Sequence, residues 1–194
     1  MIEPVERWIV CVTGFCQPES RATGVEILQD RLHRQCGNPF TRVLLRAWDD
    51  SPWHCAERIW TRRPPVDPPR VVLIGYSWGG YTANEIAKQL HRRGLAVDAL
   101  LLCDAVWRSR TILGRPLSML DCWTIRVPAN VRRCFVWRQT ANRPRGARVV
   151  VTDPITEITE SVLPHLAHQY MDDLPEFHKI ASIVACPRNE VPAA

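Results

Sequence analysis

The sequence is short of lysine and of long apolar runs, and each shortage excludes a class of protein. Lysine occurs only at Lys88 and Lys179, so the net charge of +5 comes almost wholly from arginine. The arginines stand singly or in pairs such as Arg62/Arg63, whereas a nucleic-acid surface gathers them on one face. The longest apolar runs, such as residues 71–74, fall far short of the roughly 20 residues that a membrane-spanning helix needs. We therefore expect no nucleic-acid partner and no membrane span.

The sequence also shows no secretory signal and no cysteine motif for metal or redox work. The start, MIEPVERWIV, lacks the cationic, apolar and small-residue succession of a signal peptide. The 8 cysteines include no C-x-x-C pair, and Cys11, Cys103 and Cys134 lie within apolar runs. We therefore expect a cytoplasmic protein with mostly reduced core thiols. For a disulfide, Cys11 and Cys16 are among the candidates.

Strand-like and helix-like segments alternate along the chain. With 194 residues, 46% of them hydrophobic, the chain is long enough for one folded domain, which we expect to span residues 1–194. Short β-branched runs predict strands at residues 8–15, 41–48, 71–75, 97–106, 131–139 and 148–153. Helical periodicity predicts helices at residues 21–35, 51–60 and 79–93, and another from about residue 175. This alternation predicts an α/β fold, with a mostly parallel sheet of about five or six strands and helices on both faces.

The most informative stretch places a serine between a buried strand and an amphipathic helix. Residues 71–90 read VVLIGYSWGGYTANEIAKQL and contain the pattern G-x-S-x-G around Ser77. Such a serine sits on a tight strand-to-helix turn, and Gly75, Gly79 and Gly80 leave room for the close approach that the turn requires. The helix N-terminus offers N–H groups and a positive dipole end where negative charge would develop on an attacked carbonyl. The pattern predicts a nucleophile; the alternative is a turn whose serine only caps the helix.

With this elbow the chain resembles the α/β-hydrolase superfamily, and more narrowly its small lipase, esterase and cutinase-like members. The resemblance covers nearly the whole chain and implies a minimal form of that fold, without a large cap domain or a cofactor. Lipases of this group carry His-Gly-Phe after an early strand, where this chain has Thr13-Gly14-Phe15. The resemblance implies that the backbone N–H groups of Phe15 and Trp78 form the oxyanion hole, although Thr13 departs from the usual histidine.

The resemblance also requires an acid and then a histidine later in the chain. Asp104 ends the strand that follows the nucleophile helix, so its side chain should project toward the same sheet edge as Ser77. Some lipases place their acid at this position. The more frequent position in the family is one strand later, where this chain has no acid before Asp153. That gap favours Asp104.

Three histidines are candidates for the base. The others come before the acid or lie on helices beside arginines: His33, His54 and His91. The segment HLAHQYMDDLPEFHKI resembles the C-terminal end of small bacterial and phage hydrolases, and His168 fits their catalytic histidine best. His165 is the second choice, because His178 should lie inside the last helix. A competing interpretation is a metal site made by two of these histidines and one acid: His165, His168 and Asp172 or Asp173.

Together these residues predict a serine hydrolase that cleaves small-molecule carboxylic esters or thioesters. Ser77, His168 and Asp104 would act as nucleophile, base and acid, and the reaction would pass through an acyl-enzyme. We expect an esterase or lipase-like enzyme, with Trp107 and Trp48 lining an apolar substrate cleft or else packing in the core. The alternatives are an acyltransferase and a catalytically silent binding module with the same fold.

Overall fold

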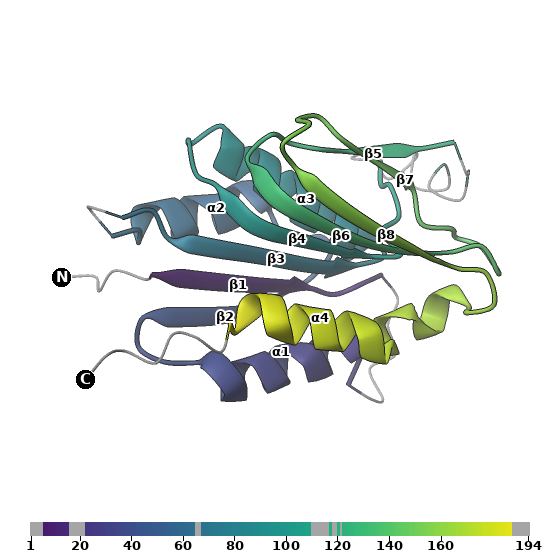
Figure 1. Ribbon diagram of the computed structural model, residues 1–194, viewed down its shortest axis with the longest axis horizontal. Helices are drawn as coiled ribbons and strands as arrows, with labels where there is room; N and C mark the ends of the chain where they lie inside the picture. Colours follow the sequence, from purple (N-terminus) through teal and green to yellow (C-terminus); the bar gives the residue numbers. More distant parts are fainter. Residues whose placement is uncertain are drawn as a thin grey trace.

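The computed structural model describes residues 6–15, 22–64, 67–109, 117, 120 and 122–187 (Figure 1). In chain order its elements are β1 (Arg7–Val12), α1 (Gly24–Cys36), β2 (Thr41–Arg46), α2 (Pro52–Thr61), β3 (Arg70–Tyr76), α3 (Trp78–His91), β4 (Val97–Cys103), β5 (Thr124–Val127), β6 (Val131–Gln139), β7 (Arg148–Val151), β8 (Glu157–Leu163), η2 (His168–Asp173) and α4 (Pro175–Ala185). The predicted α/β class is therefore confirmed.

Six strands form one sheet in the order β2-β1-β3-β4-β6-β8, and every neighbouring pair is parallel. The chain starts at β1, adds β2 on one side and then crosses to β3 on the other. Between β1 and β3 the direction of winding reverses, and open parallel sheets bind their ligands at the carboxyl ends of strands at such a point. The loops after β1 and β3 lie at that edge, on the right of Figure 1.

Helices cover both faces of the sheet, as the sequence predicts. Helices α1 and α4 lie on one face, and α2 and α3 lie on the other (Figure 1). Neighbouring residues of one strand point to opposite faces, so Leu73 packs with the α2 and α3 side and Ile74 with the α1 and α4 side. Because both side chains are fully buried, strand β3 reads as a continuous apolar run rather than an alternating one.

The main differences from the sequence prediction concern the strands. Strands β5 and β8 were not predicted from the sequence. Strand β5 has only 4 residues, and β8 is an edge strand whose mostly exposed side chains form no apolar face. Strand β7 pairs with β5 in a separate two-stranded sheet. Strand β4 ends at Cys103 rather than at residue 106, because Asp104 takes a positive φ of 43°.

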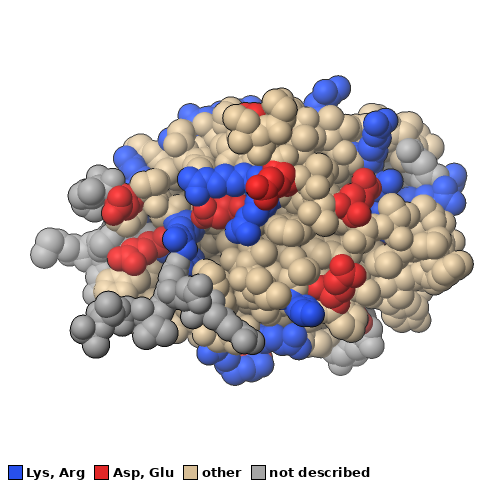
Figure 2. Space-filling model, viewed as in Figure 1, with Lys and Arg blue, Asp and Glu red and all other residues tan. Residues whose placement is uncertain are grey.

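Positive and negative side chains are interspersed on the face shown in Figure 2. Several arginines pair with carboxylates of other elements, as in Arg93–Glu57 at 3.0 Å and Arg132–Asp98 at 3.0 Å. The expected lack of a nucleic-acid partner stays a prediction. In the described part of the chain, no helix has the length and apolar composition that crossing a bilayer would take.

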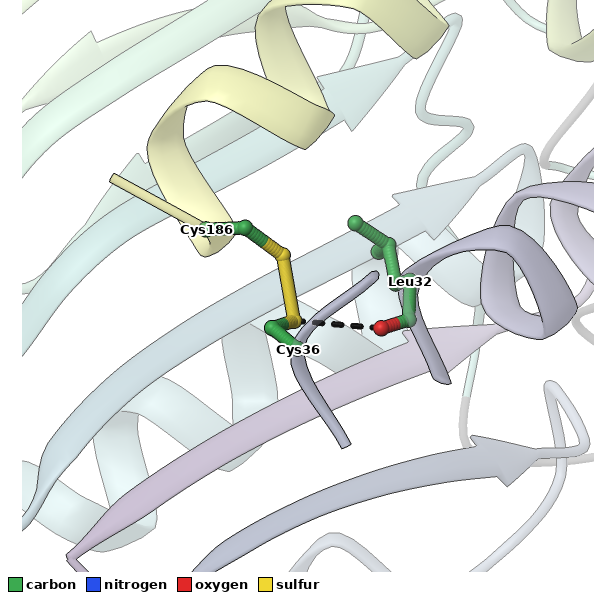
Figure 3. The surroundings of a disulfide bond; sticks show 3 residues. All are labelled: Leu32, Cys36 and Cys186. Atoms are coloured by element: carbon green, nitrogen blue, oxygen red, sulfur yellow. Dashed lines mark hydrogen bonds between the residues drawn. A yellow bond between two sulfur atoms is a disulfide. The ribbon is translucent and has the colours of Figure 1, made fainter. Parts of the chain in front are cut away.

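One disulfide joins the ends of two helices, Cys36 of α1 and Cys186 after α4 (Figure 3). The candidate suggested by the sequence differs: Cys11 is a free thiol buried in β1, and Cys16 lies outside the described residues. The bond depends on packing between α1 and α4 across 150 residues of chain, which no sequence spacing reveals. Disulfides are rare in a reducing cytosol, so this bond weighs against the expected cytoplasmic location, which stays a prediction.

Replacing Cys36 by serine should lower the stability of the fold. Cross-linking residues 150 positions apart removes entropy from the unfolded chain, and the chain-entropy estimate for that loop is about 5 kcal/mol of unfolding free energy. Urea unfolding of the oxidised protein, of the reduced protein and of Cys36→Ser measures the loss. Cys122→Ser is the control, because Cys122 is exposed and free. Equal stability of the oxidised and reduced proteins would show that the bond does not constrain the chain in solution.

Candidate active site

Ser77 occupies the turn between β3 and α3 in a strained conformation. Its φ of 54° and ψ of −127° lie in a region that residues other than glycine rarely adopt. Backbone hydrogen bonds hold it there: the N–H of Ser77 donates to the carbonyl of Cys103, and the N–H of Val106 donates to the carbonyl of Ser77, both at 3.0 Å. The turn is thus fixed by β4 and by the segment that follows it, and the Ser77 hydroxyl lies at the carboxyl edge of the sheet.

The neighbouring glycines allow α3 to start directly against the sheet. A Cβ at Gly75 would overlap the backbone of Gly79, and a Cβ at Gly79 would overlap the carbonyl oxygens of Val12 and Thr13. These contacts are with backbone atoms, which cannot rotate away as a side chain could. The packing therefore requires glycine at both positions, as the sequence pattern predicts.

Three side chains from separate elements meet at this edge. The imidazole Nε2 of His168 lies 2.9 Å from the Ser77 hydroxyl oxygen, and its Nδ1 lies 2.5 Å from Oδ2 of Asp104. An ionised carboxylate only accepts hydrogen bonds, so Nδ1 carries the proton and Nε2 presents its lone pair to the serine. This arrangement can remove a proton from the Ser77 hydroxyl.

Asp104 is fully buried, and both of its carboxylate oxygens have hydrogen-bond donors. Oδ2 faces His168, while Oδ1 accepts from the backbone N–H groups of Gln139 at 3.0 Å and Gly146 at 2.9 Å. These hydrogen bonds offset the free-energy cost of removing the carboxylate from water. The other acid considered from the sequence, Asp153, follows β7 in the small sheet, where its Oδ1 accepts from the N–H of Ile155.

The other histidines occupy different surroundings. His165 is exposed on the loop after β8. His178 is buried on α4, and its Nε2 donates to the carbonyl of Asp172 at 2.6 Å. Burial lowers the pKa of His178, which keeps this imidazole neutral. Among the described residues, no group of three or more histidine, cysteine, aspartate or glutamate side chains could hold a metal ion, in contrast to the competing interpretation.

Contacts that the sequence did not reveal fix the 3-10 helix η2, which begins with His168. The Tyr76 hydroxyl donates to the backbone carbonyl of His168 at 2.8 Å, and the Tyr76 ring stacks on the imidazole with centroids 5.1 Å apart. The Cys103 thiol donates to the carbonyl of Met171 at 3.1 Å. Tyr76 and Cys103 are the last residues of β3 and β4, so the sheet itself positions the histidine.

The loop after β1 approaches the elbow, as the resemblance implies. A Cβ at Gly14 would lie 3.2 Å from the Cβ of Ser77, and the Phe15 ring stacks on Trp78 with centroids 4.3 Å apart. Thr13, at the position of the family's histidine, donates from its hydroxyl to the carbonyl of Arg46 at 3.3 Å. The structure thus brings Phe15 and Trp78 together beside Ser77.

The two tryptophans considered as substrate contacts, Trp48 and Trp107, lie in different parts of the structure. Trp48 lies 5.0 Å from Trp78 and 5.1 Å from Phe15 between ring centroids, and these three rings form what we call the aromatic cluster. Trp107 instead stacks on Trp123 at 3.9 Å and meets Tyr81 edge-on. The structure therefore places Trp48 beside the elbow but packs Trp107 against the β5 side of the molecule.

Several free cysteines lie near the sheet, but burial suppresses their reactivity. It raises the pKa of Cys11 to about 12, that of Cys134 to about 12 and that of Cys55 to about 11. Burial also raises the pKa of Cys103, beside Asp104, well above its usual value. Because the thiolate is the nucleophilic form of cysteine, these four thiols are inert at neutral pH.

Gly146→Ala should disturb the carboxylate without touching the serine or the histidine. A methyl group at this position would overlap Oδ1 of Asp104, which is buried and has no space to retreat. A displacement of about 1 Å costs on the order of 100-fold in rate. We expect that loss in hydrolysis measured on a chromogenic substrate. The control is Gly94→Ala at the opposite end of β4. Alanine is strained at the positive φ of 70°, so this variant loses stability, but its methyl group meets nothing within 4 Å. An unchanged rate in Gly146→Ala would contradict the assignment of Asp104.

Comparisons with known proteins agree with the fold. A family model described as the thioesterase domain matches residues 62–115, less than half of the chain, and this range contains Ser77 and Asp104. A stretch of 39 residues is 49% identical to gramicidin S synthase 2 of Brevibacillus brevis; it covers 20% of this chain and only 1% of that synthase.

Two solved structures are similar over most of the chain. One is the RedJ thioesterase from the prodiginine biosynthetic pathway in Streptomyces coelicolor, with a TM-score of 0.51, 14% identity and coverage of 93% of this chain and 90% of that one. The other is RedJ with a PEG molecule bound in the active site, with a TM-score of 0.54, 14% identity and coverage of 95% and 94%. Together with the parallel sheet and the elbow, these similarities show that the chain has the α/β-hydrolase fold.

Proposed function

We propose that this protein is a serine hydrolase that cleaves acyl thioesters. The observation that carries the proposal is the hydrogen-bonded series from Ser77 Oγ through His168 to the buried Asp104. The thioesterase match over residues 62–115 supports a hydrolase of esters or thioesters. It favours the thioester over the carboxylic ester that the sequence interpretation put first.

In the first half of the proposed reaction, the Ser77 oxygen attacks the thioester carbonyl carbon while His168 Nε2 accepts the hydroxyl proton. Asp104 stabilises the imidazolium through Nδ1–H. The tetrahedral intermediate then expels the thiol, which receives the proton from Nε2. A thiol with a pKa of about 8.5 leaves far more readily than an alcohol, so this step needs little proton donation from His168. The product is an ester between the acyl group and Ser77.

In the second half, water replaces the serine oxygen. Neutral His168 accepts a proton from the water as its oxygen attacks the acyl carbon, and then returns that proton to Ser77 Oγ. A free carboxylic acid leaves and the serine is restored. No cofactor takes part in either half.

The backbone N–H groups of Trp78 and Phe15 are the proposed donors to the oxyanion. Trp78 is the first residue of α3, so its N–H lies at the positive end of the helix dipole. The approach of the Gly14–Phe15 loop to Ser77 supports the second donor. Main-chain donors explain why threonine at position 13 is compatible with this role.

The aromatic cluster of Phe15, Trp48 and Trp78 is the proposed contact surface for the acyl group. Phe15 keeps 45% of its surface exposed although it stacks on Trp78, so its ring offers apolar surface near the serine. Apolar and aromatic walls with a few polar groups are typical of small-molecule sites.

A comparison of matched substrates tests the proposed bond preference. A thioester and an oxygen ester of the same short acid should both be hydrolysed, and the thioester should have the higher kcat/KM. Thiol release is followed with a disulfide reagent in the Cys122→Ser background, because Cys122 is an exposed free thiol. Product analysis should find the free acid. Preference for the oxygen ester would restore the esterase assignment, and acyl transfer to added alcohols or thiols in place of free acid would indicate an acyltransferase.

A further inference from the structure

A single loop after β6 contacts both the acid and the base of the proposed reaction. At its start and end, the N–H groups of Gln139 and Gly146 donate to Oδ1 of Asp104. Between them, the side-chain oxygen Oδ1 of Asn142 accepts from the backbone N–H of His168 at 2.7 Å. No motif in the sequence points to any of these three residues.

These contacts close a ring of four hydrogen bonds. Gln139 N–H donates to Asp104 at 3.0 Å, and Asn142 N–H donates to Oε1 of Gln139 at 3.0 Å. His168 N–H donates to Asn142, and the His168 ring donates back to Asp104 at 2.5 Å. Each member is therefore tied to two others, and a shift of one residue must strain or break at least one bond of the ring.

Gln139 holds the loop, and with it Asn142, in a fixed place. Its side chain is only 1% exposed, and its amide donates to the carbonyls of Asn142 and Pro144, each at 2.9 Å. Its oxygen accepts from the Asn142 N–H, so both polar ends of this buried side chain are satisfied. The place of Asn142 is thus set by a buried partner rather than by a mobile surface contact.

His168 is the first residue of η2, and the N–H groups in the first turn of a helix have no acceptor within that helix. Asn142 supplies the acceptor at this position. Because the hydrogen bond holds the main chain of His168, it fixes the direction in which the imidazole leaves the backbone, and with it the distance from Nε2 to Ser77.

We propose that Asn142 is a positioning residue, which holds the base at the distance and angle needed to accept the Ser77 proton. The proposal rests on the function proposed above. Asn142 touches neither the substrate nor the reacting atoms, and it acts only through His168. Its loss should therefore lower kcat with little change in KM.

Three variants separate this role from a general effect on the fold. Asn142→Ala removes the acceptor for the His168 N–H and should lower kcat about 10- to 100-fold. Asn142→Asp keeps an oxygen at that place and should restore most of the rate. Its added negative charge favours the imidazolium, so the acidic limb of the pH–rate profile should move to higher pH. Gln169→Ala is the matched control, because it removes only the exposed bond from Asn142 Nδ2 to Gln169 at 3.2 Å and should leave kcat unchanged.

The same variants are treated with a fluorophosphonate, which reports serine activation without a substrate. Labelling should be slowed in Asn142→Ala and unchanged in Gln169→Ala, with thermal midpoints close to that of the parent protein. Equal labelling rates and equal kcat in the parent and Asn142→Ala would overturn the proposal while leaving the proposed function intact. An equal loss in Gln169→Ala, or no recovery in Asn142→Asp, would also overturn it. A parent protein that neither labels nor hydrolyses would overturn both.

Discussion

Ser77→Ala is expected to abolish thioester hydrolysis, with a fall in kcat on the order of a million-fold. In the proposed reaction the Ser77 hydroxyl oxygen attacks the carbonyl carbon, and His168 Nε2, 2.9 Å from that oxygen, accepts its proton. The variant should fold normally, because the strained turn is held by backbone bonds to Cys103 and Val106 rather than by the hydroxyl. Steady-state hydrolysis together with a circular dichroism spectrum measures both expectations.

Residual activity in Ser77→Ala would point to another nucleophile. The buried thiols of Cys11, Cys55, Cys103 and Cys134 are excluded at neutral pH by their raised pKa values. The exposed free thiol of Cys122 can be tested by Cys122→Ser, which should leave the activity of the parent protein unchanged. Activity that survives in Ser77→Ala would therefore contradict the role of the elbow itself.

Asp104→Asn should lower kcat by about 10⁴-fold, although it replaces only one carboxylate oxygen by an NH₂ group. The N–H groups of Gln139 and Gly146 both need an acceptor where Oδ1 lies, so the amide oxygen must take that place. The NH₂ group then faces His168 Nδ1 and donates to it. The imidazole consequently carries its proton on Nε2, toward Ser77, where it cannot serve as a base.

The matched control for this prediction is Asp153→Asn, which changes the first acid that follows β6 in the sequence. Asp153 caps a turn after β7, so its amide variant should keep the parent rate. Steady-state kinetics of the two variants decide between the acids. An inactive Asp153→Asn together with an active Asp104→Asn would contradict the role proposed for Asp104.

The sequence was most informative where one local pattern determines the local structure. The apolar run of β3, the glycines around Ser77 and the amphipathic helix α3 act on neighbouring residues, so their geometry can be read without the rest of the chain. Asp104 and His168 required the family resemblance in addition. The structure brings these side chains together, while their roles and the expected single domain stay predictions.

The remaining features depend on contacts between distant segments. The Cys36–Cys186 bond needs α1 and α4 to lie side by side, and Asn142 reaches His168 across 26 residues. For Trp107 the sequence leaves open a place in the substrate cleft or in the core, and only the structure shows that its ring stacks on Trp123 in the segment before β5. Sequence order gives the position of a residue along the chain but not the direction of its side chain, so these contacts could not be predicted.

The most direct test of the central claim is the mass of the intact protein after reaction with a fluorophosphonate, followed by peptide mapping. We expect a single adduct on Ser77 in the parent protein and a much slower reaction in His168→Ala, because only a serine beside a base reacts rapidly. The sequence alternative, His165→Ala, should react as fast as the parent, since His165 is exposed on its loop. No adduct, or an adduct on another residue, would contradict the claim that Ser77, His168 and Asp104 form a working active site.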